Sequence, residues 1–291
     1  MKIFLTGGTG FVGSHFLNAA HQAGHEIRAL RRSTCSSPRV ALLREPVWVE
    51  SPLTEVPIDD LHGCDVLVHL AAHSANVPYD SLENCLRMNV LEPMALLAQA
   101  VEAGIRHFVI AGSCFEFGLA GERFEFIPPT APLEPTLSYP TAKAAASIAF
   151  AGLARERNLR LSVLRIFQVF GEGEQASRMW PSLRAAALAG RDMPMTPGEQ
   201  VRDFINVRDV ANVFVDALSW PLEAGNPLFE NIGSGRPVTV RAFAERWWSQ
   251  WNASGRLLFG ALPYRQNEVM RFVPQISKLS SRTISSDSLE K

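Results

Sequence analysis

The sequence predicts an α/β fold in which helices cover both faces of a doubly wound parallel sheet. Short apolar stretches alternate along the chain with longer stretches whose apolar residues recur at helical spacing. A glycine-rich turn joins the first apolar stretch to the first helical one. Strands that alternate with helices of this length are joined by right-handed crossovers, so they lie parallel. Ligands are then expected at the carboxyl ends of the strands.

The chain opens with a strand, a glycine-rich turn and a helix. Residues 3–5 are the apolar run of a buried central strand, and residues 11–23 are apolar at helical spacing. Gly7, Gly10 and Gly13 recur every three residues across the turn. The first permits a tight turn, the second lets backbone N–H groups approach a pyrophosphate, and the third lets helix and strand pack closely. This context predicts a Rossmann-type dinucleotide site; the alternative is a glycine-rich turn with no ligand.

Two arginines follow the second strand, residues 25–30. NAD-binding units usually place an acidic residue here to hold the ribose 2′-hydroxyl. Arg31 and Arg32 stand at this point instead. Guanidinium groups bind a 2′-phosphate through paired, charge-assisted hydrogen bonds. We therefore expect NADP(H), with NAD(H) as the second option; the alternative is a pair of solvated surface arginines.

Three more strands and a long helical region complete the predicted sheet. Residues 47–49, 65–70 and 107–111 are apolar runs of strand length. Residues 79–104 are helical in period, and Pro93 breaks or kinks this region midway.

Composition excludes several classes of protein. The 28 basic and 29 acidic residues give a net charge of −1, which argues against a general nucleic-acid or membrane-surface role. No apolar run reaches the roughly 18 residues that a membrane span needs. The four cysteines are widely spaced, so we expect reduced thiols in a cytoplasmic protein. His69 and His73 lack a metal-spaced partner, so we expect packed or surface histidines and no metal site.

A candidate catalytic group follows the fifth strand. Ser113 lies at the end of that strand, and Tyr139 and Lys143 open a later helix rich in small residues. Residues four apart share one helical face. This arrangement suits a redox reaction between a carbonyl and an alcohol. Tyr139 acts on the substrate oxygen as general acid or base, and Ser113 hydrogen-bonds the same oxygen.

Lys143 is expected to lower the pKa of Tyr139. A free tyrosine has a pKa of about 10, and lowering it by about three units requires roughly 4 kcal/mol. An ammonium about 4 Å away supplies that order of energy at an effective dielectric near 20. A tyrosine four residues before a lysine occurs by chance in many helices. The strands, glycine turn and serine that precede this pair favour a catalytic interpretation over a chance occurrence.

These motifs resemble the extended short-chain dehydrogenase/reductase family, also called the NAD-dependent epimerase/dehydratase family. The matching segments are GGTGFVG at 7–13, VHLAA at 68–72, the Ser113 strand end and YPTAK at 139–143. In this resemblance Asn89 supports the site. It implies cofactor contacts from Gly7, Gly10, Phe11, Val12, Gly13, Arg31, Arg32, Leu70, Ala71, Ala72, Asn89, Tyr139 and Lys143.

The resemblance extends to about residue 279 and implies a substrate site. The segment LRIFQVFG at 164–171 is similar to the family's L-R-x-x-N-V-Y-G, with Gln168 in place of the usual asparagine. The segment RDFINVRDV at 202–210 matches R-D-F-x-x-V-x-D-V, so Arg202 is implied as a diphosphate ligand. Residues 265–268 resemble R-x-G-D, which implies that Arg265 faces the diphosphate and Glu268 the nucleotide ribose or base.

Three family activities compete, and reduction is favoured. Family dehydratases carry an Asp-Glu pair after the serine position, where this chain has Cys114 and Phe115. Cys114 as a nucleophile is a further option, against a small buried residue. Epimerases retain NAD, whereas a reductase consumes NADPH, which suits Arg31 and Arg32. We expect a nucleotide-sugar 4-ketoreductase that acts on a 4-keto-6-deoxyhexose. A 4-epimerase is the runner-up, and a non-catalytic NADP-binding sensor is a third hypothesis.

The resemblance also implies how the chain is organised. A dinucleotide-binding domain of residues 1–165 plus about 203–233 is interleaved with a smaller C-terminal substrate-binding lobe of 166–202 plus 234–291. Residues 240–251 form a helix whose Trp247, Trp248 and Trp251 either stack a base or, as we favour, pack in a core or an interface. Family members pair through four helices, so we expect a homodimer. The polar tail at 280–291 is expected to be poorly ordered.

Overall fold

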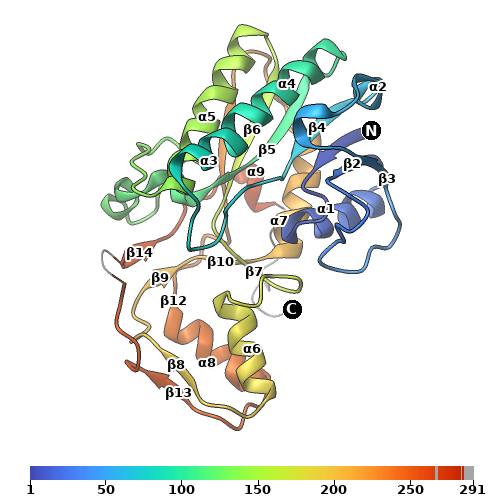
Figure 1. Cartoon of the computed structure of the whole chain (residues 1–291). Helices are drawn as coiled ribbons and strands as arrows, with labels where there is room; N and C mark the ends of the chain where they lie inside the picture. The colour runs from blue at the N-terminus through green and yellow to red at the C-terminus, as the bar shows by residue number, and fades with distance from the viewer. Residues whose placement is uncertain (266–267, 283, 285–291) are drawn as a thin grey trace.

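The centre of the computed structural model, which describes residues 1–265, 268–282 and 284, is a seven-stranded parallel sheet (Figure 1). The strand order is β11-β6-β5-β4-β1-β2-β3, and every neighbouring pair is parallel. The strands are β1 (Lys2–Thr6), β2 (Glu26–Arg31), β3 (Val47–Glu50), β4 (Val66–His69), β5 (His107–Ser113), β6 (Arg160–Ile166) and β11 (Leu228–Ile232). The order reverses between β1 and β4. The predicted doubly wound parallel sheet is confirmed.

Helices cover both faces of the sheet. On one face lie α1 (Phe11–Gln22) and α7 (Val207–Asp216), and on the other α2 (Ile58–Leu61), α3 (Leu82–Leu86), α4 (Glu92–Glu102) and α5 (Ser138–Glu156) (Figure 1).

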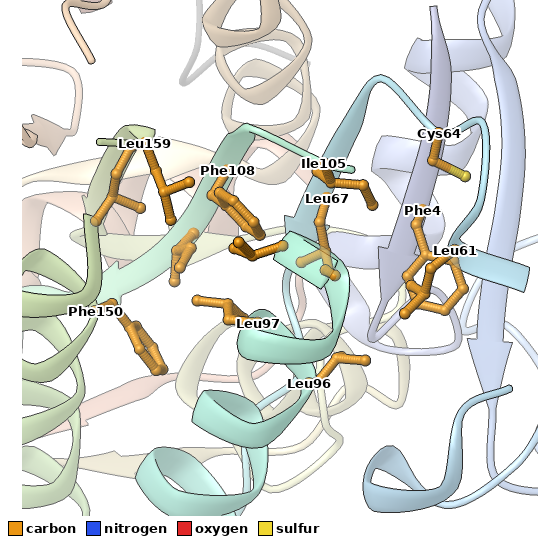
Figure 2. Close-up of a cluster of buried hydrophobic side chains, with 14 of the residues drawn as sticks. Phe4, Leu61, Cys64, Leu67, Leu96, Leu97, Ile105, Phe108, Phe150 and Leu159 are labelled. Carbon is orange, nitrogen blue, oxygen red and sulfur yellow. The ribbon is translucent and has the colours of Figure 1, made fainter. Parts of the chain in front are cut away.

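Successive strand residues enter different cores because a strand alternates its side chains. Ile3 and Leu5 pack with α1 and α7, whereas Phe4 packs in the cluster on the α4 side (Figure 2). All three side chains are 0% exposed. Burial on both faces explains why this stretch is a continuous apolar run.

The long helical region is continuous through Pro93. A π-helical turn, Arg87–Leu91, joins α3 to α4, and Pro93 is the second residue of α4. The backbone N–H of Glu92 bonds to the carbonyl of Arg87, five residues earlier. Within a continuous helix a proline has no N–H to donate, and in a regular α-helix its ring would crowd the carbonyl four residues earlier. The wider turn thus accommodates the proline without a break.

The C-terminal ends of the larger sheet carry a smaller lobe (Figure 1). It contains α6 (Met179–Leu188), α8 (Val240–Gln250) and the short strands β7 (Gln168–Phe170), β8 (Met193–Met195), β9 (Val201–Arg202), β12 (Val238–Thr239), β13 (Leu257–Phe259) and β14 (Arg271–Phe272). The short strand β10 (Phe204–Asn206) follows the first segment of this lobe and pairs with β7. Trp247 and Trp248 are buried in its core, and Trp251 packs partly buried against it. The core-packing interpretation of these tryptophans is therefore confirmed.

The last helix within the described residues is α9 (Lys278–Ser281). The predicted poor order of the tail concerns residues 280–291, of which 283 and 285–291 lie outside the described residues. Within the part of the chain that the structure describes, no helix is both long and apolar enough to cross a membrane.

Candidate active site

A cleft of about 980 Å³ lies at the carboxyl ends of the strands, where the strand order reverses between β1 and β4. This is where open α/β sheets bind their ligands. The predicted catalytic residues and every predicted cofactor residue except Asn89 line this cleft. The lining also includes Gln168 from the predicted substrate residues.

The glycine turn forms the cradle that the sequence predicts. A Cβ atom on Gly13 would lie 2.0 Å from the carbonyl oxygen of Gly7, and one on Gly7 would lie 2.5 Å from the amide nitrogen of Ala71. No side chain caps the N-terminus of α1 at Gly10, so its backbone N–H groups are available to a ligand. A close-packed turn before an uncapped helix fits a dinucleotide pyrophosphate.

The arginines after β2 differ in their surroundings. The Nη2 atom of Arg31 lies 2.5 Å from Glu50 Oε1, and its guanidinium carbon lies 5.1 Å from the centre of the Trp48 ring. Arg32 is exposed and also lines the cleft. A third arginine, Arg39, lines it as well. Sequence reasoning missed Arg39 because it stands in an irregular polar loop.

Asn89 is buried outside the cleft lining and hydrogen-bonds to a loop that lines the cleft. Its side chain is 3% exposed and bonds both the N–H and the carbonyl of His73, at 2.8 and 3.1 Å. It also donates to the carbonyl of Cys85 at 3.0 Å. Asn89 therefore holds the loop after β4, which lines the cleft, from the π-helical turn.

The catalytic candidates converge from β5 and α5. The Lys143 ammonium donates to the carbonyl of Ala111 at 2.7 Å. Ser113 ends β5, and its hydroxyl accepts from the Phe115 N–H at 3.3 Å. Tyr139 and Lys143 are buried and stand one turn apart on α5. Ser113 and the Tyr139–Lys143 pair, which come from two elements distant in the sequence, thus share one cleft.

The pKa of Tyr139 is raised, which corrects the lowering that the sequence suggested. Burial is the main cause, and the negative charge of Glu116 adds to it, while the Ser113 side chain opposes it. Burial also lowers the pKa of Lys143. Desolvation and the buried Glu116 carboxylate both favour the neutral phenol, and neither can be deduced from the spacing of Tyr139 and Lys143.

Glu116 is a buried charge that sequence reasoning missed. Its carboxylate accepts from the Ser113 N–H at 2.7 Å, the Ser147 hydroxyl at 2.8 Å and Arg165 Nε at 2.8 Å. Its side chain is 0% exposed and that of Arg165 4%. The Arg165 guanidinium carbon lies 4.9 Å from the ring centre of Phe117. This ion pair fixes the end of β5 beside α5, and its members lie far apart in the sequence.

His69 and Cys114 are structural, as the sequence analysis favoured. His69 is buried with its Nδ1 atom 2.7 Å from the Thr6 hydroxyl, and burial lowers its pKa to about 3. Burial raises the pKa of Cys114 to about 12, so its thiol is a poor nucleophile. His73 is paired with Asp80 at 2.7 Å. The described residues contain no group of three His, Cys, Asp or Glu side chains that could hold a metal ion.

Three predicted substrate residues lie outside the cleft lining. Arg202 and Glu268 pair with each other at 2.8 Å, and Arg202 also donates to the Val269 carbonyl at 2.6 Å. Arg265 is exposed, and its charge acts on Tyr79, whose ring centre lies 5.4 Å from that of Tyr139.

Two loops that line the cleft contact each other. The side chains of Asn76, after β4, and Gln175, after β7, hydrogen-bond to each other, and both residues line the cleft. The second loop is also held by His15 of α1, whose Nε2 atom lies 2.8 Å from the Glu172 carbonyl. Residues 172–175 therefore link α1 to the loop after β4. We call this segment the bridging loop.

The sheet, the glycine cradle and the Ser-Tyr-Lys group together define an extended short-chain dehydrogenase/reductase. Comparison with known proteins gives the family: the model of the NAD dependent epimerase/dehydratase family matches residues 3–233, and the chain belongs to that family.

Three similar proteins represent the range of activities within it. CDP-abequose synthase of Salmonella muenchen is 24% identical over 276 residues, which cover 92% of this chain and 87% of that protein. UDP-glucose 4-epimerase of Azospirillum brasilense is 29% identical over 274 residues, covering 82% and 74%. The structure of an NAD-dependent NDP-hexosamine 5,6-dehydratase of tunicamycin biosynthesis superposes with a TM-score of 0.83 at 27% identity, covering 97% and 90%.

Proposed function

We propose that the protein reduces the C4 ketone of a nucleoside-diphosphate 4-keto-6-deoxyhexose. The observation that carries this proposal is the cleft itself, in which a buried tyrosine and lysine lie beside a glycine cradle for a dinucleotide. The similarity to CDP-abequose synthase over 92% of the chain supports the choice of a nucleotide-sugar substrate.

Tyr139 is the general acid in this proposal. Burial raises the pKa of its phenol, so the group is protonated at neutral pH, which is the form that a ketone reduction consumes. NADPH, when bound, supplies the hydride that reaches C4. The Tyr139 proton goes to the carbonyl oxygen, and the Ser113 hydroxyl hydrogen-bonds the same oxygen. Lys143 contributes positive charge that stabilises the phenolate left behind.

NADP(H) is the preferred cofactor in this proposal, with NAD(H) as the second option. Glu50 already neutralises Arg31. Arg32 and Arg39 are exposed cations in the lining, and they are the groups we assign to a 2′-phosphate.

The smaller lobe, residues 166–202 and 234–291, is proposed to bind the nucleotide diphosphate. Gln168 is in the cleft lining. Arg202, Arg265 and Glu268 would join it if the lobe closes on its ligand. Such closure is common in enzymes that bind between two lobes. We also infer a cytoplasmic enzyme from the four unpaired cysteines.

A 4-epimerase is the second candidate, and the bridging loop favours it. An epimerase retains its cofactor through many turnovers, and a cleft-lining loop that is tied at both ends would oppose release of the cofactor. Dehydration is less well supported because Cys114 and Phe115 offer no acid or base after Ser113.

One experiment separates the candidates. Purified protein is mixed with NADPH and a panel of CDP-, dTDP- and GDP-4-keto-6-deoxy sugars, and absorbance at the nicotinamide band is followed. A reductase oxidises NADPH in proportion to sugar. An epimerase purifies with bound cofactor and interconverts sugars without net nicotinamide change. Binding of NADPH with neither activity would support the sensor hypothesis and contradict the proposal.

A further inference from the structure

Glu174 and Arg178 form an acid–base pair in the cleft that the proposed reaction does not use. Glu174 belongs to the bridging loop, and Arg178 directly precedes α6. Both residues line the cleft, and Arg178 Nε lies 3.3 Å from Glu174 Oε1. The loop is therefore built around a charged contact within the ligand cavity.

The second carboxylate oxygen of this pair has no partner. Glu174 Oε2 is buried without a hydrogen bond, and the side chain is 7% exposed. Burial raises the pKa of Glu174 to about 7, although the positive charge of Arg178 opposes the rise. A buried acceptor left unpaired costs free energy, so such groups in native proteins usually meet a protein, water or ligand donor.

The pair lies near the catalytic end of the cleft. Burial raises the pKa of both Tyr79 and Cys114, and the positive charge of Arg178 is close enough to act against that rise at both groups. Tyr79 packs against Tyr139. Ligand groups that reach this end are sugar rings, whether the hexose of the substrate or the nicotinamide ribose of the cofactor. Both offer hydroxyl donors, and a carboxylate oxygen is a strong acceptor for a hydroxyl.

We propose that Glu174, held by Arg178, accepts a hydrogen bond from a sugar hydroxyl of the bound ligand and so selects for it. The identity of the ligand rests on the proposed function. A site built to bond a hydroxyl discriminates strongly against an analogue that lacks it, because the buried acceptor is then left unpaired.

Titration calorimetry of Glu174→Ala tests this assignment. The ligand pairs are UDP and UDP-glucose, CDP and CDP-glucose, and dTDP and dTDP-glucose, with NADPH measured alone. For each pair we take the Kd of the nucleoside diphosphate divided by the Kd of its glucose derivative. This ratio measures the contribution of the hexose to binding, because the contribution of the nucleotide cancels. Loss of one hydrogen bond to a charged acceptor should reduce this ratio about tenfold or more if the hexose is the donor. If NADPH affinity falls by the same factor and the ratio is unchanged, the cofactor ribose is the donor of the hydrogen bond.

Two further variants control for structure. Glu172→Ala, two residues earlier on the bridging loop, removes a carboxylate that is 71% exposed and should change neither measurement. Glu174→Gln keeps the size of the side chain and should show a smaller loss in the same measurement, even if the alanine variant unfolds. Thermal unfolding of each variant identifies folding defects.

The proposal is overturned if Glu174→Ala and Glu174→Gln bind NADPH like the wild type and leave the ratio unchanged. The proposal is also overturned if the variants bind a nucleoside diphosphate and its glucose derivative equally less tightly, with no change for NADPH. Glu174 would then act on the ligand through its charge and not through a hydrogen bond to a sugar hydroxyl. If the wild type binds NADPH but none of the sugar nucleotides, the proposed function fails. The NADPH measurement then decides the role of Glu174 alone.

Discussion

The hydroxyl of Tyr139 is the one atom on which the proposed chemistry depends. Its raised pKa keeps it protonated, so it can donate a proton. Tyr139→Phe should lower kcat for ketone reduction by about 10²–10⁴, the usual contribution of a general acid, with little change in the KM for NADPH. Steady-state kinetics measure both constants. Retention of full turnover by this variant would exclude Tyr139 as the acid.

The pH dependence of reduction follows from the same group. The protonated phenol is the active form, so kcat for reduction should fall as pH rises through the pKa of Tyr139 in the complex. Because that pKa is raised, the fall should lie on the alkaline side of neutrality. The reverse oxidation needs the phenolate and should rise with pH. A profile of kcat from pH 6 to about 10 tests the sign, and a reduction rate that rises towards alkaline pH would contradict it.

The buried pair of Glu116 and Arg165 holds the catalytic strand end in place. Glu116→Gln leaves the Arg165 guanidinium charged, buried and without its counter-ion. Breaking such a pair costs about 3–5 kcal/mol, whereas replacing both partners is far less costly. Chemical denaturation should therefore give a low stability for Glu116→Gln and partial recovery for Glu116→Gln with Arg165→Met. A single variant as stable as the wild type would show that the pair does not support the site.

At the scale of elements, the glycine turn between β1 and α1 gives a matched test. Gly13→Ala places a Cβ atom 2.0 Å from the Gly7 carbonyl oxygen, so the turn must distort and cofactor affinity should be lost. Gly8→Ala lies in the same turn, but its Cβ meets only side-chain atoms, the nearest being Leu5 Cδ2 at 3.3 Å. It should bind NADPH nearly as the wild type does. Fluorescence titration with NADPH compares the two, and equal affinities would exclude the cradle as the binding site.

The elements were predictable where their signal is local. The strands at residues 3–5 and 107–111 and the helix at 11–23 are periodic segments between glycines, so burial and spacing are visible in the sequence. Tyr139 and Lys143 were found because their spacing is fixed by one helix. Local pattern therefore predicted the sheet and placed these two candidate residues on one helix.

Contacts between distant segments were not predictable. The partner of Glu116 is Arg165, and the partner of Asn76 is Gln175, each set by how strands and loops meet. The pKa of Tyr139 had the wrong predicted direction for the same reason, since it depends on burial and on Glu116. A sequence records which charges exist but not which of them the fold buries together.

At the scale of the whole molecule, exposed apolar residues on two helical segments indicate how two copies meet. Leu91 and Ile148, at the end of the π-helical turn and on α5, are 65% and 64% exposed. Gly152 lies one turn beyond Ile148, and a Cβ there would meet nothing within 4 Å. Small and apolar residues on a helix surface suit close helix packing.

We therefore predict a homodimer through α4 and α5 that Ile148→Glu dissociates. A charge placed in an apolar interface loses hydration without gaining a partner. Light scattering at micromolar concentration should give a dimer for the wild type and a monomer for the variant. Val47→Glu, an exposed apolar residue at 64% on the far edge strand β3, is the control and should stay dimeric. A monomeric wild type would refute the prediction.

The stability of the whole fold at acid pH should depend on His107, at the start of β5. This histidine is 1% exposed, and neither ring nitrogen has a hydrogen-bond partner. Burial, together with the charge of Arg160, lowers its pKa to about 4. Between pH 6.5 and 4 the unfolded chain binds a proton here that the folded chain does not, so this histidine destabilises the fold increasingly as pH falls.

His107→Leu removes the effect. Its stability relative to the wild type should grow by up to about 1.4 kcal/mol for each pH unit in that window. Using the difference between the two proteins cancels groups with the opposite sign, such as Asp203, whose pKa burial raises to about 6. Urea denaturation from pH 4.5 to 8 measures the difference, with His62→Leu, at an exposed site, as control. A constant difference across this range would mean that His107 is not a buried neutral histidine in solution.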